Sequence, residues 1–199
     1  VVPWDNGAVS TIATGTGNTS TAENEGKEIP LTQFSVRKMT LAAFFAALIT
    51  VCSWISLPVA DIAFTMQTFG VFLALGLLGG KWGSVAIAIY LLLGAVGMPV
   101  FSGFRGGISV LLGVTGGYIW GFLAATLIYW AVTALFGLDR RVKLPAMVLG
   151  MAVCYTCGSL WYAFMYAGGS VWAVVSACVV PYLVPDGIKI GLALSLAGR

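Results

Sequence analysis

The sequence predicts an all-α membrane protein with six transmembrane helices. Long stretches without any charged residue make up most of the chain beyond residue 40, and the longest cover residues 106–138 and 144–185. A helix that crosses the ~30 Å hydrocarbon core of a bilayer needs about 20 mainly apolar residues. The composition agrees, since 59% of residues are hydrophobic and 9% are charged, whereas a soluble surface carries far more charge.

The beginning of the chain has a different character. Residues 1–36 are rich in Ser, Thr, Gly and Asn, and such a segment cannot bury enough apolar area to offset the entropy lost on ordering. It lacks the basic start and the apolar core of a signal peptide. We therefore expect a flexible polar tail over residues 1–36 and a six-helix transmembrane domain over residues 37–199.

The basic residues predict the topology. They fall in four groups: Arg37 and Lys38; Lys81; Arg140, Arg141 and Lys143; and Arg199. Two predicted spans separate each group from the next: 41–57 and 65–79, then 83–98 and 108–136, then 144–167 and a last helix that ends at 199. Because basic residues near span ends tend to stay in the cytoplasm, both termini are expected inside.

The uncharged run 144–185 is long enough for two crossings, but a further crossing would place Arg199 outside. We favour one crossing that ends near residue 167, followed by a turn at Gly168 and Gly169. Residues 171–180 would then form a partly re-entrant or interfacial helix, interrupted by Pro181 and Pro185. The last helix is expected to begin near Pro185, because proline suits the first turn of a helix.

Composition and motifs exclude several functions. The chain has no histidine and a net charge of +3, which excludes histidine metal sites and gives no basic patch for nucleic acid. No metal site is predicted. Residues 76–82 resemble a phosphate-binding loop, but Trp82 stands where Ser or Thr would hold magnesium, so any ATP must be used by another polypeptide. Cys154 and Cys157 lie in an apolar stretch, which favours inert thiols over a redox pair.

Four ionisable residues lie within or beside the predicted spans, and in the expected topology all four collect at outer helix ends: Asp61, Arg105, Asp186 and Lys189. A charge at membrane depth is costly and by default marks a functional site. Asp186 and Lys189 are three residues apart and share a helix face. They either bind a ligand that carries N–H donors and a carboxylate, or they pair with each other and cap the helix. Arg105, in a glycine-rich loop, is by itself more typical of a lipid-facing surface loop.

Small residues suggest two further contacts. Thr115, Gly117 and Tyr118 lie in a segment with a double glycine, which indicates a packing notch, an unwound turn or a ligand contact. Helix packing is the commonest reason for a membrane glycine. The first span carries a stripe of small residues that permits close helix packing, either within the chain or with a partner: Ala42, Ala43, Ala46 and Ala47.

Four segments together resemble the BioY family, the biotin-specific S components of energy-coupling factor (ECF) transporters. They are residues 64–68 (Phe-Thr-Met-Gln-Thr), 91–101, 115–122 and 181–189. The resemblance extends from about residue 39 to residue 197. The chain departs from the family pattern where Pro185 replaces a glycine and Val114 replaces a proline.

The resemblance implies a six-helix substrate-binding domain that captures biotin with high affinity at the outer face of a bacterial cell membrane. It implies that Asp186 accepts hydrogen bonds from the ureido N–H groups and that Lys189 meets the valerate carboxylate. Arg105 could supply a second carboxylate contact, and aromatic walls are expected from Tyr118 and Trp161. The matching motifs add three more candidate binding residues: Gln67, Thr115 and Gly117.

The same resemblance implies a binding subunit and not an enzyme, without a cofactor of its own. Uptake would require two ATPases and a membrane T component, and the alanine stripe resembles the face that S components offer to the T component. Two alternatives stay open: an S component for another small vitamin, or a solitary biotin transporter without an energising module. A membrane enzyme is disfavoured, since the sequence offers no convergent acid, base or metal-ligand groups.

Overall fold

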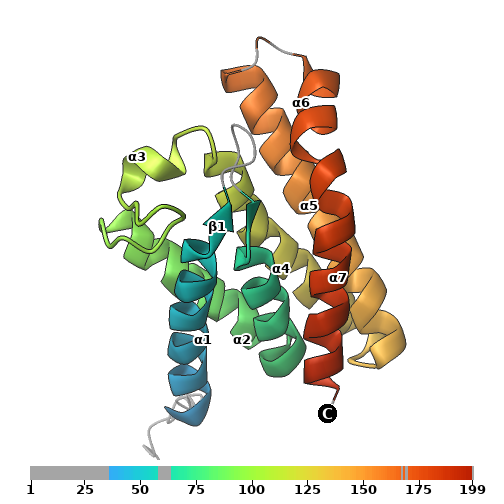
Figure 1. The fold of residues 1–199 in the computed structure, drawn as a ribbon. Helices are drawn as coiled ribbons and strands as arrows, with labels where there is room; N and C mark the ends of the chain where they lie inside the picture. Colours follow the sequence, from blue (N-terminus) through green and yellow to red (C-terminus); the bar gives the residue numbers. More distant parts are fainter. Residues whose placement is uncertain (1–35, 58–63, 167, 169, 199) are drawn as a thin grey trace, which may run out of the picture. The chain divides into compact units, whose positions relative to one another are not determined.

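Helices make up most of the residues that the computed structural model describes, which are 36–57, 64–166, 168 and 170–198. Residues 1–35 of the predicted tail and Asp61 lie outside these residues, and Val36, the last residue of that tail, begins a helix. The helices are α1 (Val36–Trp54), α2 (Gln67–Ala95), α3 (Ile108–Leu111), α4 (Gly116–Phe136), α5 (Arg140–Met165), α6 (Val171–Cys178) and α7 (Val180–Ala197) (Figure 1). Two short strands, β1 (Ser56–Leu57) and β2 (Phe64–Thr65), pair antiparallel between α1 and α2.

Helix α2 is folded back on itself at Gly79. This glycine has φ 77° and ψ 177°, a conformation that residues with a side chain rarely adopt. A Cβ atom added at Gly83 would lie 3.2 Å from the Cα atom of Leu75, although eight residues of a straight helix span about 12 Å. The chain therefore reverses at Gly79, and the two arms of α2 correspond to the predicted spans 65–79 and 83–98.

The described residues contain five helices that are long and apolar enough to cross a membrane, namely α1, α2, α4, α5 and α7. The all-α membrane fold is therefore confirmed, and the predicted count of six is close. The difference lies in α2, which provides two of the predicted spans as one bent helix. Its first arm, residues 67–78, rises only about 18 Å, which is shorter than the hydrocarbon core.

The predicted helix 108–136 is wrong in its first part, because it is divided into α3 and α4. Two backbone carbonyls between them accept hydrogen bonds from side chains of α5 and of the residue after it. The indole nitrogen of Trp161 donates to the carbonyl of Gly113 at 3.1 Å, and the Tyr166 hydroxyl donates to that of Leu112 at 3.1 Å. The double glycine therefore begins α4 and does not interrupt a helix.

The last helix begins at Val180 and not near Pro185, which corrects the predicted start. Pro181 lies in its first turn, where a missing N–H group costs nothing. Pro185 is only one turn further along and removes one intrahelical bond. The predicted helix 171–180 is present as α6, and Val179, with φ −119° and ψ −53°, separates it from α7.

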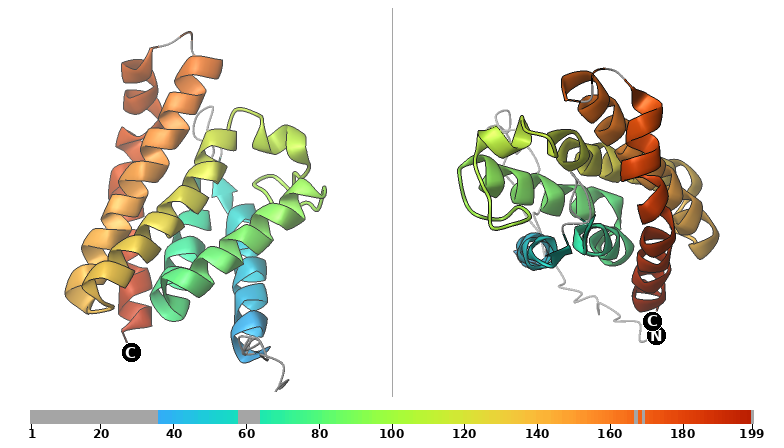
Figure 2. Two further views of the ribbon diagram at one scale, coloured as in Figure 1. Left: turned by 180° about the vertical axis from the view of Figure 1, so that it is seen from behind. Right: turned by 45° about the horizontal axis from the view of Figure 1, so that its top comes forward.

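The basic groups that the structure describes gather at one end of the helices. The first turn of α1, the bend of α2, the junction of α4 and α5, and the end of α7 all lie at the lower end in Figure 1, and Figure 2 shows the same from behind. Helix α3, the end of α5 and the start of α6 lie towards the opposite end, and the strands lie near mid-height in Figure 1. The core between α1, α2, α4, α5 and α7 is apolar, with Ile49, Leu75 and Met147 fully buried.

Candidate functional site

An ion pair is buried in α7, where Asp186 and Lys189 lie one turn apart. The Lys189 Nζ atom is 2.7 Å from the Asp186 Oδ1 atom, and the two residues are only 4% and 5% exposed, respectively. Buried charges persist in proteins when they are paired and hydrogen-bonded. The prediction that these two residues share a helix face is confirmed, and they contact each other directly.

Two further elements complete the bonding of this pair. The Tyr155 hydroxyl, from α5, donates to the Asp186 Oδ2 atom at 2.5 Å. The Lys189 Nζ atom also donates to the backbone carbonyl of Thr65 at 2.7 Å, and it lies 3.7 Å from the ring centre of Phe64. Each carboxylate oxygen therefore accepts one hydrogen bond, and the network joins α5, α7 and β2.

The ion pair borders a cavity with about 780 Å³ of space that atoms do not fill, part of it open to the surroundings. Its lining is largely apolar and aromatic with a few polar groups, as in most small-molecule sites. The lining residues are Phe64, Thr65, Gln67, Thr68, Phe101, Ser102, Arg105, Val110, Thr115, Tyr118, Ile119, Phe122, Met151, Cys154, Tyr155, Cys178, Tyr182 and Asp186.

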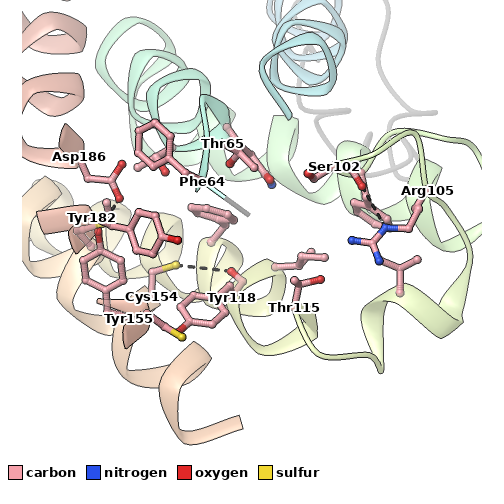
Figure 3. A pocket seen from close by; sticks show the side chains of 18 residues that line it. Phe64, Thr65, Ser102, Arg105, Thr115, Tyr118, Cys154, Tyr155, Tyr182 and Asp186 are labelled. Carbon is pink, nitrogen blue, oxygen red and sulfur yellow. Dashed lines mark hydrogen bonds between the residues drawn. The ribbon is translucent and has the colours of Figure 1, made fainter. Parts of the chain in front are cut away.

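Opposite charges lie at opposite ends of this cavity. Figure 3 shows Asp186 beside Tyr155 and Tyr182 at one end, and Arg105 beside Ser102 at the other. Thr65, Tyr118 and Thr115 lie between them in this view. An elongated ligand could therefore meet a carboxylate with one end and a guanidinium with the other.

Arg105 is held by its own loop. Its Nε atom donates to the carbonyl of Ser102 at 3.2 Å, and the backbones of Phe101 and Arg105 pair as an isolated bridge. Phe104, between them, has φ 56°, which is typical of a tight turn. Arg105 also borders a second cavity lined by Ser109, Val110, Gly113, Val114, Thr115, Tyr162 and Tyr166. The guanidinium group therefore stands between the main cavity and the second cavity.

The structure brings most of the predicted site residues together. Asp186, Arg105, Tyr118, Thr115 and Gln67 all line the main cavity. Lys189 lies behind this lining, covered by the Phe64 ring, which stacks on Tyr182 with ring centres 5.7 Å apart.

Gly117 and Trp161 are not among the lining residues. They pack against each other, since a Cβ atom at Gly117 would lie 2.2 Å from that of Trp161.

The alanine stripe on α1 has two faces. Ala42 and Ala46 are 0% and 1% exposed and pack inside the fold. Ala43 and Ala47 are exposed on the outer side of the helix. Only the second pair is available to a partner.

Sequence reasoning missed Tyr155, which supplies the only hydroxyl bonded to Asp186 within the described residues. The signal was present, because a tyrosine in the middle of an uncharged run needs a partner for its hydroxyl. The partner lies 31 residues away in the chain, so spacing alone could not identify it.

Long apolar helices around a cavity with a buried ion pair define a multi-pass membrane protein with an internal ligand-binding site. A sequence model of the BioY family matches residues 24–199. The chain belongs to the BioY family.

The chain matches two relatives over nearly the whole length of each. The chain is 36% identical over 170 residues to a protein named biotin transporter BioY from Thermotoga maritima, covering 82% of this chain and 95% of that protein. It is 39% identical over 164 residues to a probable biotin transporter BioY from Pyrococcus horikoshii, with the same coverage of 82% and 95%.

A solved structure has the same fold. The match is to the S-component for biotin from an ECF-type ABC transporter, with a TM-score of 0.74, 24% sequence identity, and coverage of 81% of this chain and 89% of that one. At this identity the likeness establishes the fold.

Proposed function

We propose that this protein captures biotin and takes part in its uptake as the S component of an ECF-type transporter. The observation that carries the proposal is the cavity with Asp186 at one end and Arg105 at the other. Biotin is elongated, with two ureido N–H donors in its head and a carboxylate at the end of its tail. The names of the BioY relatives support the same ligand.

The head of biotin pairs with Asp186 in this proposal. A carboxylate has about four lone-pair positions, and Tyr155 and Lys189 occupy one on each oxygen. The remaining positions can accept the ureido N–H groups. Hydrogen bonds to a charged acceptor are roughly twice as strong as neutral ones, so this contact contributes much of the affinity.

The tail of biotin pairs with Arg105 rather than with Lys189. Lys189 is covered by Phe64 and already bonds to Asp186 and Thr65, so its role is to balance the charge of Asp186 and to hold β2 against α7. Arg105 lines the opposite end of the cavity, and a guanidinium group binds a carboxylate with two parallel hydrogen bonds. This distribution revises the assignment of the tail to Lys189.

The test compares biotin with its methyl ester, which lacks the tail charge, in equilibrium binding to the detergent-purified chain. Arg105→Gln is expected to weaken biotin by about tenfold, or 1.4 kcal/mol, and to leave the ester nearly unchanged. Lys189→Gln is expected to weaken both ligands equally, because it acts through Asp186. Lys81→Gln, at the bend of α2, serves as the control for a lost positive charge.

One result would count against this function, and another against the assignment of the tail to Arg105. Absence of saturable biotin binding by folded wild-type protein would exclude biotin capture. A loss of ester discrimination in Lys189→Gln, with Arg105→Gln like wild type, would return the tail to Lys189.

The partners and the orientation follow from the same assignment. The basic groups at one end of the helices support cytoplasmic termini by the positive-inside rule, so the cavity faces the outside of the cell membrane. Energy for uptake comes from two ATPases through a T component, which docks on the face of α1 that carries Ala43 and Ala47. Small residues there permit close helix packing.

A further inference from the structure

A groove separate from the main cavity lies between the beginning of α1 and the bend of α2. It has about 720 Å³ of space that atoms do not fill, part of it open to the surroundings. None of its lining residues lines the main cavity, so the groove does not belong to the proposed biotin site. The lining residues are Arg37, Lys38, Leu41, Leu77, Leu78 and Trp82.

The groove combines two kinds of surface. Arg37 and Lys38 are exposed and bring two positive charges. Leu41 and Leu77 bring apolar surface, since they are 39% and 51% exposed. Trp82 is partly buried, and tryptophan is enriched where a membrane meets water. A ligand that matches both surfaces carries a negative head group and an apolar chain.

No carboxylate from the described part of the chain lines the groove. The acidic residues there are Asp139 and Asp186. Neither lines the groove, and Asp186 is paired with Lys189 inside the fold. A third positive charge, the exposed Lys81, adjoins the groove at the bend of α2. The charge of the groove therefore favours an anionic head group over a zwitterionic one.

The short first arm of α2 places the groove near lipid head groups. This arm rises only about 18 Å before the chain reverses at Gly79, whereas the hydrocarbon core is ~30 Å thick. In Figures 1 and 2 the first turn of α1 extends further towards this end than the bend of α2. A short span is accommodated by local thinning of the bilayer or by flanking residues that reach its interface. Either way, head groups of the leaflet at this end come close to the groove.

We propose that this groove binds one anionic phospholipid of the cytoplasmic leaflet, with its phosphate at Arg37 and Lys38 and an acyl chain along the leucines. Arginine binds a phosphate with two parallel hydrogen bonds, and lysine acts as a point charge. The site differs from the proposed docking face of a T component, because Ala43 is two residues beyond Leu41 and thus about 200° around α1. It also does not depend on the proposed biotin function.

The experiment measures the apparent dissociation constant of the first lipid bound to the detergent-purified chain, by native mass spectrometry. Dioleoylphosphatidylglycerol and dioleoylphosphatidylcholine are titrated separately. They share their acyl chains, so the ratio of their constants reports the preference for an anionic head group. The double variant Arg37→Gln, Lys38→Gln is compared with Arg140→Gln, Arg141→Gln. This control removes two exposed charges at the same end of the helices but outside the groove.

We expect wild type and the Arg140, Arg141 control to bind phosphatidylglycerol about tenfold more tightly than phosphatidylcholine. The ratio should fall to near one in Arg37→Gln, Lys38→Gln. A ratio near one in wild type, or equal ratios in the two double variants, would overturn the proposal. Inorganic phosphate, which has no acyl chain, should not displace the bound lipid. Displacement by phosphate at the concentration of the lipid would show a site for a free anion instead.

The fluorescence of Trp82 locates the acyl chain. Phosphatidylglycerol that is brominated in its acyl chains quenches tryptophans that it contacts. With one lipid per protein, the emission that wild type has beyond Trp82→Phe should fall. The same difference taken with Trp120→Phe, which removes an exposed tryptophan of α4, should stay unchanged. Bound lipid that leaves Trp82 unquenched would place the lipid outside the groove and overturn the proposal.

Discussion

Single residues around Asp186 determine whether its buried carboxylate is held in position to bind a ligand. Its two oxygens accept from Lys189 and Tyr155 at 2.7 and 2.5 Å, which fixes the orientation of the group towards the cavity. The sequence could predict Asp186 and Lys189 as a pair, since they are one helical turn apart. It could not predict Tyr155 or Thr65 as their partners, because those contacts join distant segments.

Tyr155→Phe removes one of these hydrogen bonds and leaves the ring in place. We expect biotin affinity to fall about tenfold, because a hydrogen bond to a charged group contributes about 1.5–3 kcal/mol. Tyr166→Phe is the control, since it also loses a hydroxyl bond, but to the carbonyl of Leu112. Equal affinities of Tyr155→Phe and wild type in an equilibrium binding assay would contradict this role.

Lys189→Met leaves Asp186 as an unpaired buried charge. The expected loss of stability is about 3–5 kcal/mol, measured as a lower midpoint of thermal unfolding in detergent. The double variant with Asp186→Asn should recover most of this loss, because the uncompensated charge is gone, yet it should not recover biotin binding. A double variant as unstable as Lys189→Met would show that the charge of Asp186 is not the cause.

At the scale of elements, close contacts between glycines and aromatic rings position α4 against α5. Gly117 meets Trp161, and a Cβ atom at Gly158 would lie 2.2 Å from the Tyr118 ring. The apolar runs predicted the helices themselves well. They failed at the break before α4, where two side chains from the end of α5 bond to backbone carbonyls. They also failed at the start of α7, because Pro181 is tolerated in a first turn.

Gly117→Ala tests this packing. The added Cβ atom meets backbone-linked atoms of Trp161 that cannot move away, so we expect a lower thermal midpoint and weaker biotin binding as the cavity wall shifts. Gly191→Ala is the matched control, since nothing lies within 4 Å of its added Cβ atom, and alanine is favoured over glycine in helices by about 1 kcal/mol. Equal midpoints of thermal unfolding for the two variants would refute this close packing of Gly117 against Trp161.

At the scale of the whole molecule, the proposed binding site and the proposed docking face are different surfaces. The cavity lies between α2, α4, α5 and α7, whereas Ala43 and Ala47 are exposed on α1. We expect Ala43→Trp to retain biotin affinity and to lose biotin uptake in cells that also produce the energising module. Leu135→Trp, a change at an exposed position on α4, should retain both. Full biotin uptake by cells with Ala43→Trp would show that this face of α1 is not the docking site.

The most direct measurement is the equilibrium binding of biotin to the purified wild-type protein and to Asp186→Asn. The account predicts saturable binding at one site, which Asp186→Asn weakens by more than about tenfold, or 1.4 kcal/mol. The asparagine is nearly isosteric but presents N–H donors where the ligand also donates. Folded wild-type protein without saturable binding, or an Asp186→Asn variant that binds biotin as tightly as wild type, would contradict the central claim.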